Sequence, residues 1–180
     1  MRRFRNHDGA TTSLTWGALL GDVNTAGKQL RACAKRAGFG KGHRIHGVGD
    51  GAPWIAHQIK ERFGAQSSYL VDFFHVCDYL SAAAQAIHSE VPAQQLWLQT
   101  QKERLKTQGL GPLLNDLQAN LEPVDTPEEL APIRRCHRYL SHRQDQLDYE
   151  GPPCQTSCRP IMIAESPHRI DIYEPKCVFN

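Results

Sequence analysis

Long hydrophobic runs are missing from this sequence. The longest apolar stretches, such as SYLVDFFHV at residues 68–76, are short and interrupted by polar side chains. A membrane-spanning helix needs about 20 consecutive apolar residues, so no membrane partner is expected. The basic opening MRRFRNHDG leads into no apolar segment of the kind that a secretory signal contains. We therefore expect a protein of the cytoplasm.

Aromatic residues are also few, at 8%, but 40% of the 180 residues are hydrophobic. This is enough for one domain with a real core, with or without an appendage. The formal charge of +2 is compatible with a polyanionic partner without requiring one. Cations gather in KRAGFGKGHR (35–44) and IRRCHRYLSHR (133–143), where solvated helix faces are the default interpretation and contact of His137, His142 and Arg143 with a DNA backbone is the alternative.

The six cysteines do not indicate a disulfide framework, because the chain is large and carries no export signal. Cys154 and Cys158 in PPCQTSC, completed by Cys177 or a histidine, suggest a zinc site. Structural zinc sites usually offer two close-spaced ligand pairs, and a second pair is missing here. A small zinc protein therefore remains one alternative.

Residues 22–90 show an alternation of helix and strand signals. Residues 22–38 begin with the acceptor Asp22, end with a glycine and carry an apolar stripe, which predicts a helix. Two strands are predicted at 44–50 and 67–74, and two more helices at 53–64 and 75–88, the first opening with a proline. This order predicts an α/β unit in which a right-handed crossover joins a parallel pair of strands.

Two aspartates stand near the predicted strand ends. Asp50 ends the first strand within GVGDGAPWI, and Asp72 lies near the end of the second within VDFFHV. Active-site groups in such sheets lie at the carboxyl ends of the strands, so both positions are candidates for chemistry. The alternative is structural, because a glycine-flanked aspartate commonly holds a turn and His75 could cap the next helix.

The rest of the chain has a different character. Residues 91–150 predict a helical insertion: two helices separated by GLGP at 109–112, then a third that starts with the capping pair Thr126 and Glu129, with Pro127 first in the helix. Residues 1–21 are expected to be an irregular N-terminal remnant. Residues 151–180, with prolines, scattered cysteines and no sustained period, are expected to be an irregular, degenerate C-terminal tail.

Three blocks in order carry a family resemblance. The sequence GDGAPWI, then VDFFHV, then the helical region ending in YLSHRQDQLDY resembles the bacterial insertion-sequence transposases of the Kra type, which are related to the Mutator-like DDE enzymes. The resemblance covers roughly residues 17–149. It implies a partial RNase H-like core, and DNA transposition by strand cleavage and transfer at a site with two Mg²⁺ or Mn²⁺ ions.

The resemblance also implies roles for particular residues. Asp50 matches the second acidic metal ligand, and Asp72 with His75 matches a D-x-x-H pair that supports the site. Glu165, in RPIMIAESPHR, matches the last metal-binding carboxylate, although the Gly-Ser-Gly of the family motif is absent and the segment is two residues short. The expected partners are transposon ends and target DNA, with a homo-oligomer left open.

The first acidic ligand of the family has no clear match. Asp8 and Asp22 are the candidates by position and by proximity to a glycine, and neither follows a strand pattern. We therefore expect a truncated fragment that is inactive alone, because a two-metal site lacking one of its three carboxylates binds metal poorly. The alternative in the same context is a DNA-binding remnant or domesticated protein without catalysis, held by phosphate contacts.

Overall fold

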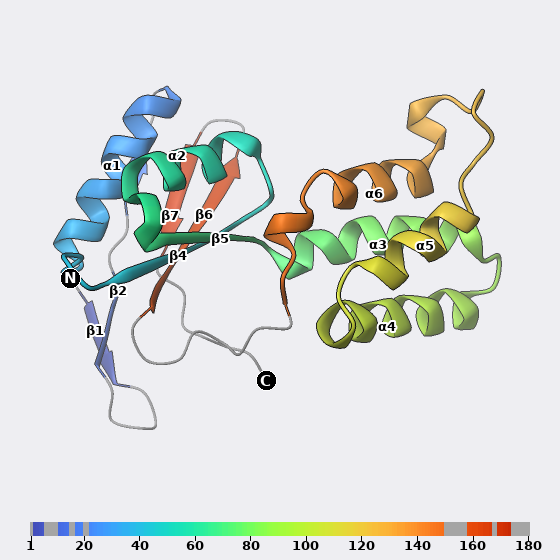
Figure 1. The fold of residues 1–180 in the computed structure, drawn as a ribbon, viewed down its shortest axis with the longest axis horizontal. Coiled ribbons are helices and arrows are strands. Elements are labelled where there is room, and N and C mark those ends of the chain that lie inside the picture. Colours follow the sequence, from blue (N-terminus) through green and yellow to red (C-terminus); the bar gives the residue numbers. More distant parts are fainter. Residues whose placement is uncertain are drawn as a thin grey trace. The chain divides into compact units, whose positions relative to one another are not determined.

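The computed structural model describes residues 2–5, 11–14, 17–19, 22–149, 158–166 and 169–173, with side chains described for 22–149 (Figure 1). The chain forms two compact units. Unit 1 comprises Met1–Leu70 and Pro152–Asn180, and unit 2 comprises Val71–Gly151. The protein is therefore of mixed α/β class, with its strands in unit 1 and a group of helices in unit 2.

Unit 1 is built on a five-stranded sheet of order β3-β7-β6-β4-β5. The strands β4 and β6 are parallel, whereas β6 with β7 and β7 with β3 are antiparallel. A separate antiparallel pair is formed by β1 and β2. The bounds are β1 Arg2–Arg5, β2 Thr11–Leu14, β3 Gly17–Leu19, β4 Arg44–Gly49, β5 Ser67–Val71, β6 Cys158–Ser166 and β7 Arg169–Tyr173.

Helix α1, Val23–Arg36, confirms the helix predicted at 22–38. Asp22 caps it by accepting a hydrogen bond from the backbone N–H of Thr25 at 2.7 Å, which satisfies one of the amide groups left without an intrahelical partner. The turn that follows contains Gly38 at φ +92°, a left-handed conformation that glycine adopts without strain. The local signals at both ends were therefore sufficient to place this helix.

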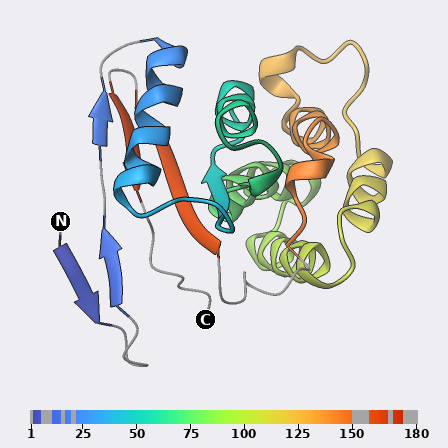
Figure 2. The ribbon, with the colours of Figure 1, turned by 60° about the vertical axis from the view of Figure 1, so that its left-hand side comes forward.

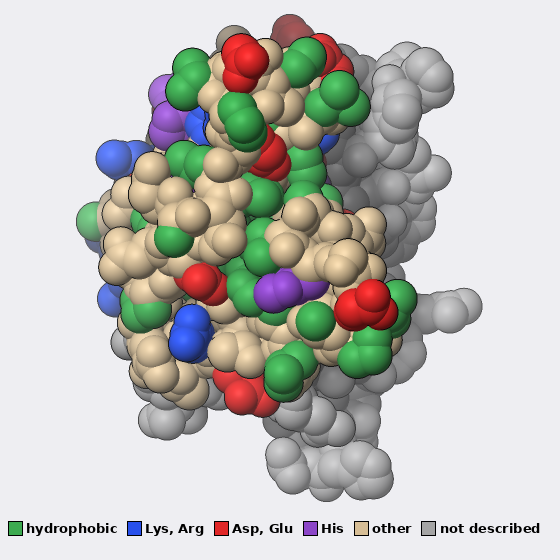
Figure 3. Space-filling view, turned by 90° about the vertical axis from the view of Figure 1, so that its right-hand side faces the viewer, with side chains coloured by type: hydrophobic (Ala, Val, Ile, Leu, Met, Phe, Trp, Pro, Cys, Tyr) green, Lys and Arg blue, Asp and Glu red, His purple; other side chains and the backbone are tan. Residues whose placement is uncertain are grey.

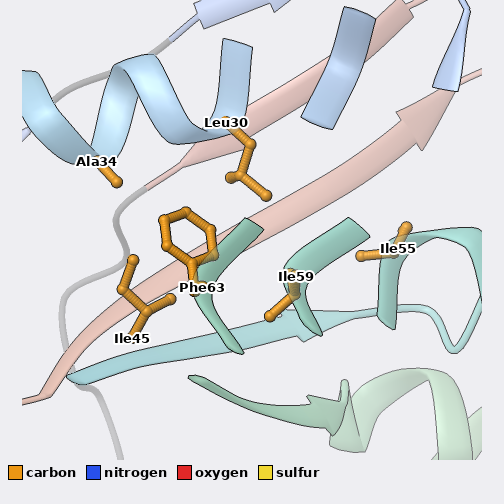
Figure 4. Close-up of a cluster of buried hydrophobic side chains, with 6 residues drawn as sticks. All are labelled: Leu30, Ala34, Ile45, Ile55, Ile59 and Phe63. Atoms are coloured by element: carbon orange, nitrogen blue, oxygen red, sulfur yellow. The ribbon is translucent and has the colours of Figure 1, made fainter. Parts of the chain in front are cut away.

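The core of unit 1 lies among α1, α2 (Pro53–Phe63) and β4. Figure 4 shows the side chains of the three elements directed toward one another. The ring of Phe63 also meets Phe39 edge to face, with centroids 5.2 Å apart. Burying a side chain such as Leu30 or Ile59 contributes about 1.5–3 kcal/mol, so this cluster anchors both helices on the sheet. Its members are Leu30, Ala34, Ile45, Ile55, Ile59 and Phe63.

Unit 2 contains four helices, drawn green to orange in Figures 1 and 2. Helix α3 packs against α4 and α6, and α5 packs against α4 and α6. Helix α3 thus belongs with the helical unit, whereas the sequence suggested a boundary near residue 90. The bounds are α3 Phe73–Ile87, α4 Val91–Thr107, α5 Gly111–Ala119 and α6 Pro132–Ser141, with 3₁₀ turns η1 at Gly64–Gln66, η2 at Glu128–Leu130 and η3 at Gln144–Gln146.

The start of α6 differs from the prediction. The capping pair Thr126 and Glu129 does not open this helix, because residues Glu128–Leu130 form only a 3₁₀ turn and the helix begins at Pro132. Proline disfavours a helical conformation at the preceding residue, so Ala131 separates the 3₁₀ turn from the helix. The carboxylate of Glu122 caps the helix instead, accepting from the N–H groups of Ile133 at 2.7 Å and Arg134 at 2.9 Å.

Both ends of the chain contribute strands where the sequence suggested irregular segments. Strand β3 and strands β6 and β7 join the five-stranded sheet, and β1 pairs with β2. Each is stabilised by pairing with another strand, and such pairing leaves little periodicity in a short segment. Within the described residues, no helix has the length and apolar character needed to span a bilayer.

Candidate functional site

Asp50 lies one residue past β4, in the turn that precedes α2, whereas the sequence predicted it as the last residue of the strand. Its carboxylate Oδ1 accepts a hydrogen bond from the N–H of Ala52 at 2.9 Å. Gly51 has φ +85°, and its N–H donates to the hydroxyl of Tyr69 on β5 at 3.1 Å. The half-buried carboxylate is therefore held by its own turn, and that turn is fastened to the neighbouring strand.

Glu165 lies near the carboxyl end of β6, the parallel neighbour of β4. The register pairs Val48 with Met162, so continuing it past the end of β4 puts Asp50 opposite Ala164, next to Glu165 in the chain. Neighbouring strands lie about 4.8 Å apart. The backbone positions of the two candidate metal ligands thus meet at one edge of the sheet.

The start of α2 adds a favourable electrostatic feature at the same edge. Ala52 is the N-cap and provides no side-chain cap, Pro53 occupies the first turn, and that turn contains no acidic residue. Unpaired N–H groups and the aligned peptide dipoles give a helix N-terminus a partial positive charge. A negatively charged group close to Asp50 would be stabilised there, in partial compensation for the repulsion by the carboxylate.

Asp72 and His75 lie in unit 2, at the start of α3. Asp72 is the N-cap, and its carboxylate accepts from the N–H of Phe74 at 3.0 Å. The ring of His75 meets Tyr79 and Tyr139 edge to face, at centroid separations of 5.5 and 5.7 Å. Both residues therefore have structural roles within unit 2, and their support of a metal site stays a prediction.

The aromatic cluster beside His75 joins two helices. Tyr79 on α3 and Tyr139 on α6 stack at 4.0 Å with an interplanar angle of 13°. The guanidinium of Arg143 lies 4.1 Å above the Tyr139 ring, a cation–π arrangement. Arg143, which the sequence placed on a solvated face, is thus engaged in packing within unit 2.

A polar pair that joins β4 to β5 was not predicted. His46 on β4 and Ser68 on β5 are joined by a hydrogen bond of 2.8 Å between Nδ1 and Oγ. Burial lowers the pKa of His46 from its ordinary value, so the ring is neutral near pH 7. Because its two members lie on different strands, the pair has no recognisable spacing in the sequence and could not be predicted from it.

Oxygen donors are what Mg²⁺ and Mn²⁺ prefer, and the pair Asp50 and Glu165 provides them. Within residues 22–149, no three His, Cys, Asp or Glu side chains lie close enough to hold a metal ion. Asp22 is exposed at the N-cap of α1, and Asp8, the other candidate for a first ligand, lies outside the described residues. The donor chemistry of the two carboxylates fits a hard divalent cation.

Cysteines 154 and 177 of the zinc alternative lie outside the described residues, and Cys158 begins β6. Cys33, Cys77 and Cys136 are free thiols. Burial raises the pKa of the Cys136 thiol to about 12, so it stays protonated near neutral pH. Within residues 22–149, none of these three cysteines belongs to a group of three side chains that could hold a metal ion.

The chain has no match among family models, curated proteins or solved structures. The transposase resemblance therefore rests on the three sequence blocks and on Asp50 and Glu165.

Proposed function

We propose that this chain is a transposase of the DDE type, with an RNase H-like core that cleaves and transfers DNA strands by two-metal phosphoryl transfer. The observation that supports it is the parallel register of β4 and β6, which brings the backbones of Asp50 and Glu165 to the same sheet edge. Two carboxylates on neighbouring strand ends are suited to binding one divalent ion each or to sharing one. The first carboxylate of the class is the unassigned part of the proposal.

Asp50 and Glu165 are the residues that would hold the metal. When bound, Mg²⁺ or Mn²⁺ polarises the phosphoryl oxygens and lowers the pKa of the attacking hydroxyl. The chain itself contributes position. The turn of Asp50 is closed by the N–H of Ala52 and fastened by Tyr69, so its carboxylate is preorganised, and Gly51 presents no side chain where a phosphate approaches.

Metal binding provides the direct test. Mn²⁺ affinity can be measured by water-proton relaxation with the intact chain, in the presence and absence of duplex DNA. Asp50→Asn keeps the oxygen that accepts from Ala52 N but removes the charge, so it should weaken Mn²⁺ binding at least tenfold without loosening the turn. Glu165→Gln should do the same.

Asp78→Asn is the matched control, because it removes the same charge from an exposed position on α3 and Asp78 is not a candidate ligand. Equal Mn²⁺ affinity in the wild type, Asp50→Asn and Glu165→Gln would refute the metal assignment. Strand cleavage of supercoiled DNA with Mg²⁺ or Mn²⁺ is the second measurement. Any cleavage should be slow, given two assigned carboxylates, and should be lost in Asp50→Asn.

The second candidate function is DNA binding without catalysis. The distribution of charge favours it, because unit 1 carries 14 Lys and Arg against 7 Asp and Glu. Under this alternative, DNA affinity would fall steeply with salt and would need no metal. Salt-dependent binding together with unchanged Mn²⁺ affinity in Asp50→Asn would favour it over the transposase proposal.

A further inference from the structure

The two units carry opposite net charge. Unit 1 has 14 Lys and Arg and 7 Asp and Glu, a net charge of +7, whereas unit 2 has 7 and 12, a net charge of −5. The near-neutral total of +2 conceals this difference. A net positive unit attracts polyanions over roughly a Debye length, about 10 Å at 0.1 M salt.

The cations of unit 1 include a stripe on α1. Lys28, Arg31 and Lys35 recur at spacings of three and four residues, so they share one helical face, and all three are exposed. The buried residues of α1, including Leu30 and Ala34, lie on the other side of the helix against the core. No Asp or Glu occurs between residues 23 and 36, and the carboxylate that interacts with the stripe is Asp22, at the start of the helix near Lys28.

The loop after α1 continues the positive charge. Lys41 is exposed in this loop, and Arg44 is exposed at the first position of β4. The side chain of Gln66 fixes the loop by donating to the carbonyl oxygens of Gly40 at 3.3 Å and His43 at 2.9 Å. The loop backbone is thus preorganised, which lowers the entropy lost when its cations meet a ligand.

One member of the stripe is held in place from α2. The guanidinium of Arg31 donates to the carbonyl oxygen of Arg62 at 2.9 Å. A side chain already restrained by one hydrogen bond keeps its charge and its other N–H donors for a second acceptor. We call Lys28, Arg31, Lys35, Lys41 and Arg44 the α1 basic face.

Several cations of unit 2 contact groups of their own unit instead. Arg134 donates to the carbonyl oxygens of Thr126 at 3.0 Å, Glu122 at 3.2 Å and Pro123. Arg138 pairs with Glu128, and Arg104 lies 4.0 Å from Asp116. Figure 3 shows a face on which acidic side chains are scattered among hydrophobic ones. Most cations at 133–143 therefore contact groups of their own unit.

We propose that the α1 basic face binds the phosphate backbone of duplex DNA. Lysine and arginine contacts to phosphates are independent of sequence and need neither a metal ion nor Asp50. The choice of DNA rests on the proposed function. The binding itself extends that function, because it assigns residues that would hold the DNA while the carboxylates act.

The test is DNA affinity of the intact chain, measured by fluorescence anisotropy with a labelled duplex in EDTA at several salt concentrations. Lys28→Gln combined with Lys35→Gln is the test variant, since both residues are exposed and glutamine is a good helix former. Lys102→Gln combined with Arg135→Gln removes the same charge from unit 2. Thermal unfolding followed by circular dichroism verifies that both variants fold.

The test variant should bind DNA about tenfold more weakly at 0.1 M salt. Its plot of log affinity against log salt concentration should also have a slope shallower by about two, because each lost phosphate contact reduces the slope by about 0.9. The control should match the wild type. Equal weakening of both variants, or no weakening of the test variant, would overturn the proposal, as would absence of DNA binding by the wild type.

The outcome is separable from that of the metal site. Asp50→Asn should bind DNA in EDTA at least as tightly as the wild type, because the substitution removes a negative charge that repels phosphate. If the α1 variant loses DNA affinity while Asp50→Asn leaves Mn²⁺ affinity unchanged, the α1 basic face stands and the catalytic proposal falls. If Mn²⁺ binding depends on Asp50 but the α1 variant binds DNA normally, the metal site stands and the α1 basic face is refuted.

Discussion

The hydroxyl of Tyr69 accepts a hydrogen bond of 3.1 Å from the backbone N–H of Gly51, and so ties the turn after β4 to the neighbouring strand β5. The same turn is closed from within by Asp50 and Ala52. The candidate metal ligand is thus fixed from two directions.

Gly51→Ala should destabilise the protein and displace Asp50. At φ +85° an alanine is strained by about 1–2 kcal/mol, and this should appear in the free energy of unfolding in urea. Mn²⁺ affinity should fall as well. Gly111→Ala is the control, because nothing lies within 4 Å of its added Cβ and its φ is not left-handed. An unaltered stability in Gly51→Ala would contradict the turn geometry.

Gly47→Ala should show how closely α2 approaches β4. An added Cβ would lie 2.2 Å from Cδ1 of Ile59, so the core must open, at a cost of about 1–3 kcal/mol. Ile59→Val removes that Cδ1 and by itself costs about 0.5–1.5 kcal/mol. The double variant should be more stable than the sum of the two losses predicts, by about 1 kcal/mol in a double-mutant cycle. Simple additivity would exclude the contact.

Asp116 should be the most sensitive polar position in unit 2. Its Oδ2 accepts from Trp97 Nε1 at 2.9 Å and from Gln101 Nε2 at 2.7 Å, and Gln101 is only 1% exposed. Asp116→Ala leaves a buried amide unpaired and should cost about 2 kcal/mol in urea unfolding. Asp116→Asn, which keeps one accepting oxygen, should cost less. Gln118→Ala on the exposed side of α5 is the control, and an equal loss there would argue against the network.

The half-buried imidazole of His46 predicts a decline in stability in mild acid. Burial lowers the pKa of His46 in the folded chain, so the unfolded chain takes up the proton at a higher pH. This contribution to stability is complete above the unfolded pKa of about 6.5 and is lost as pH falls toward the lowered folded value. Urea unfolding of the wild type at several pH values between 7.5 and 5 should show the decline.

His46→Gln should remove that part of the pH dependence, which amounts to at most about 1.4 kcal/mol per pH unit for one proton. His57→Gln changes a histidine whose side chain is 72% exposed, and it serves as the control. If the loss of stability in acid is the same in His46→Gln as in the wild type, groups other than His46 cause it.

The parts of the fold that follow from local chemistry were predictable. Asp22 and Gly38 mark the ends of α1, and Pro53 and Gly64 mark those of α2, because caps and turns act within a few residues. The start of α6 was not predictable, because the residue that caps it, Glu122, lies eleven residues before Ile133. The strands β3, β6 and β7 depend on partners far along the chain, which no short window of sequence contains.

The candidate site divides in the same way. Asp50 was placed at a strand end by the pattern of glycines and apolar residues around it. The adjacency of Glu165 to Asp50 depends on the register of β6 beside β4, which the sequence did not predict. Asp72 also stood at a strand end, yet its observed role is to cap α3. Asp50 and Asp72 have similar local sequence patterns. Whether such an aspartate is a candidate metal ligand or a helix cap therefore depends on the residues around it in the fold.

The parallel pairing of β4 with β6 also has a consequence for biosynthesis. Val48 and its partner Met162 are 114 residues apart, and all of unit 2 is translated between them. The helices of unit 2 make mostly nearby contacts and can form during translation, whereas one edge of β4 stays unpaired until residues 158–166 have been synthesised. A nascent chain stalled before residue 158 should therefore hold a folded helical unit and an exposed strand edge, which chaperones would have to cover until β6 is available.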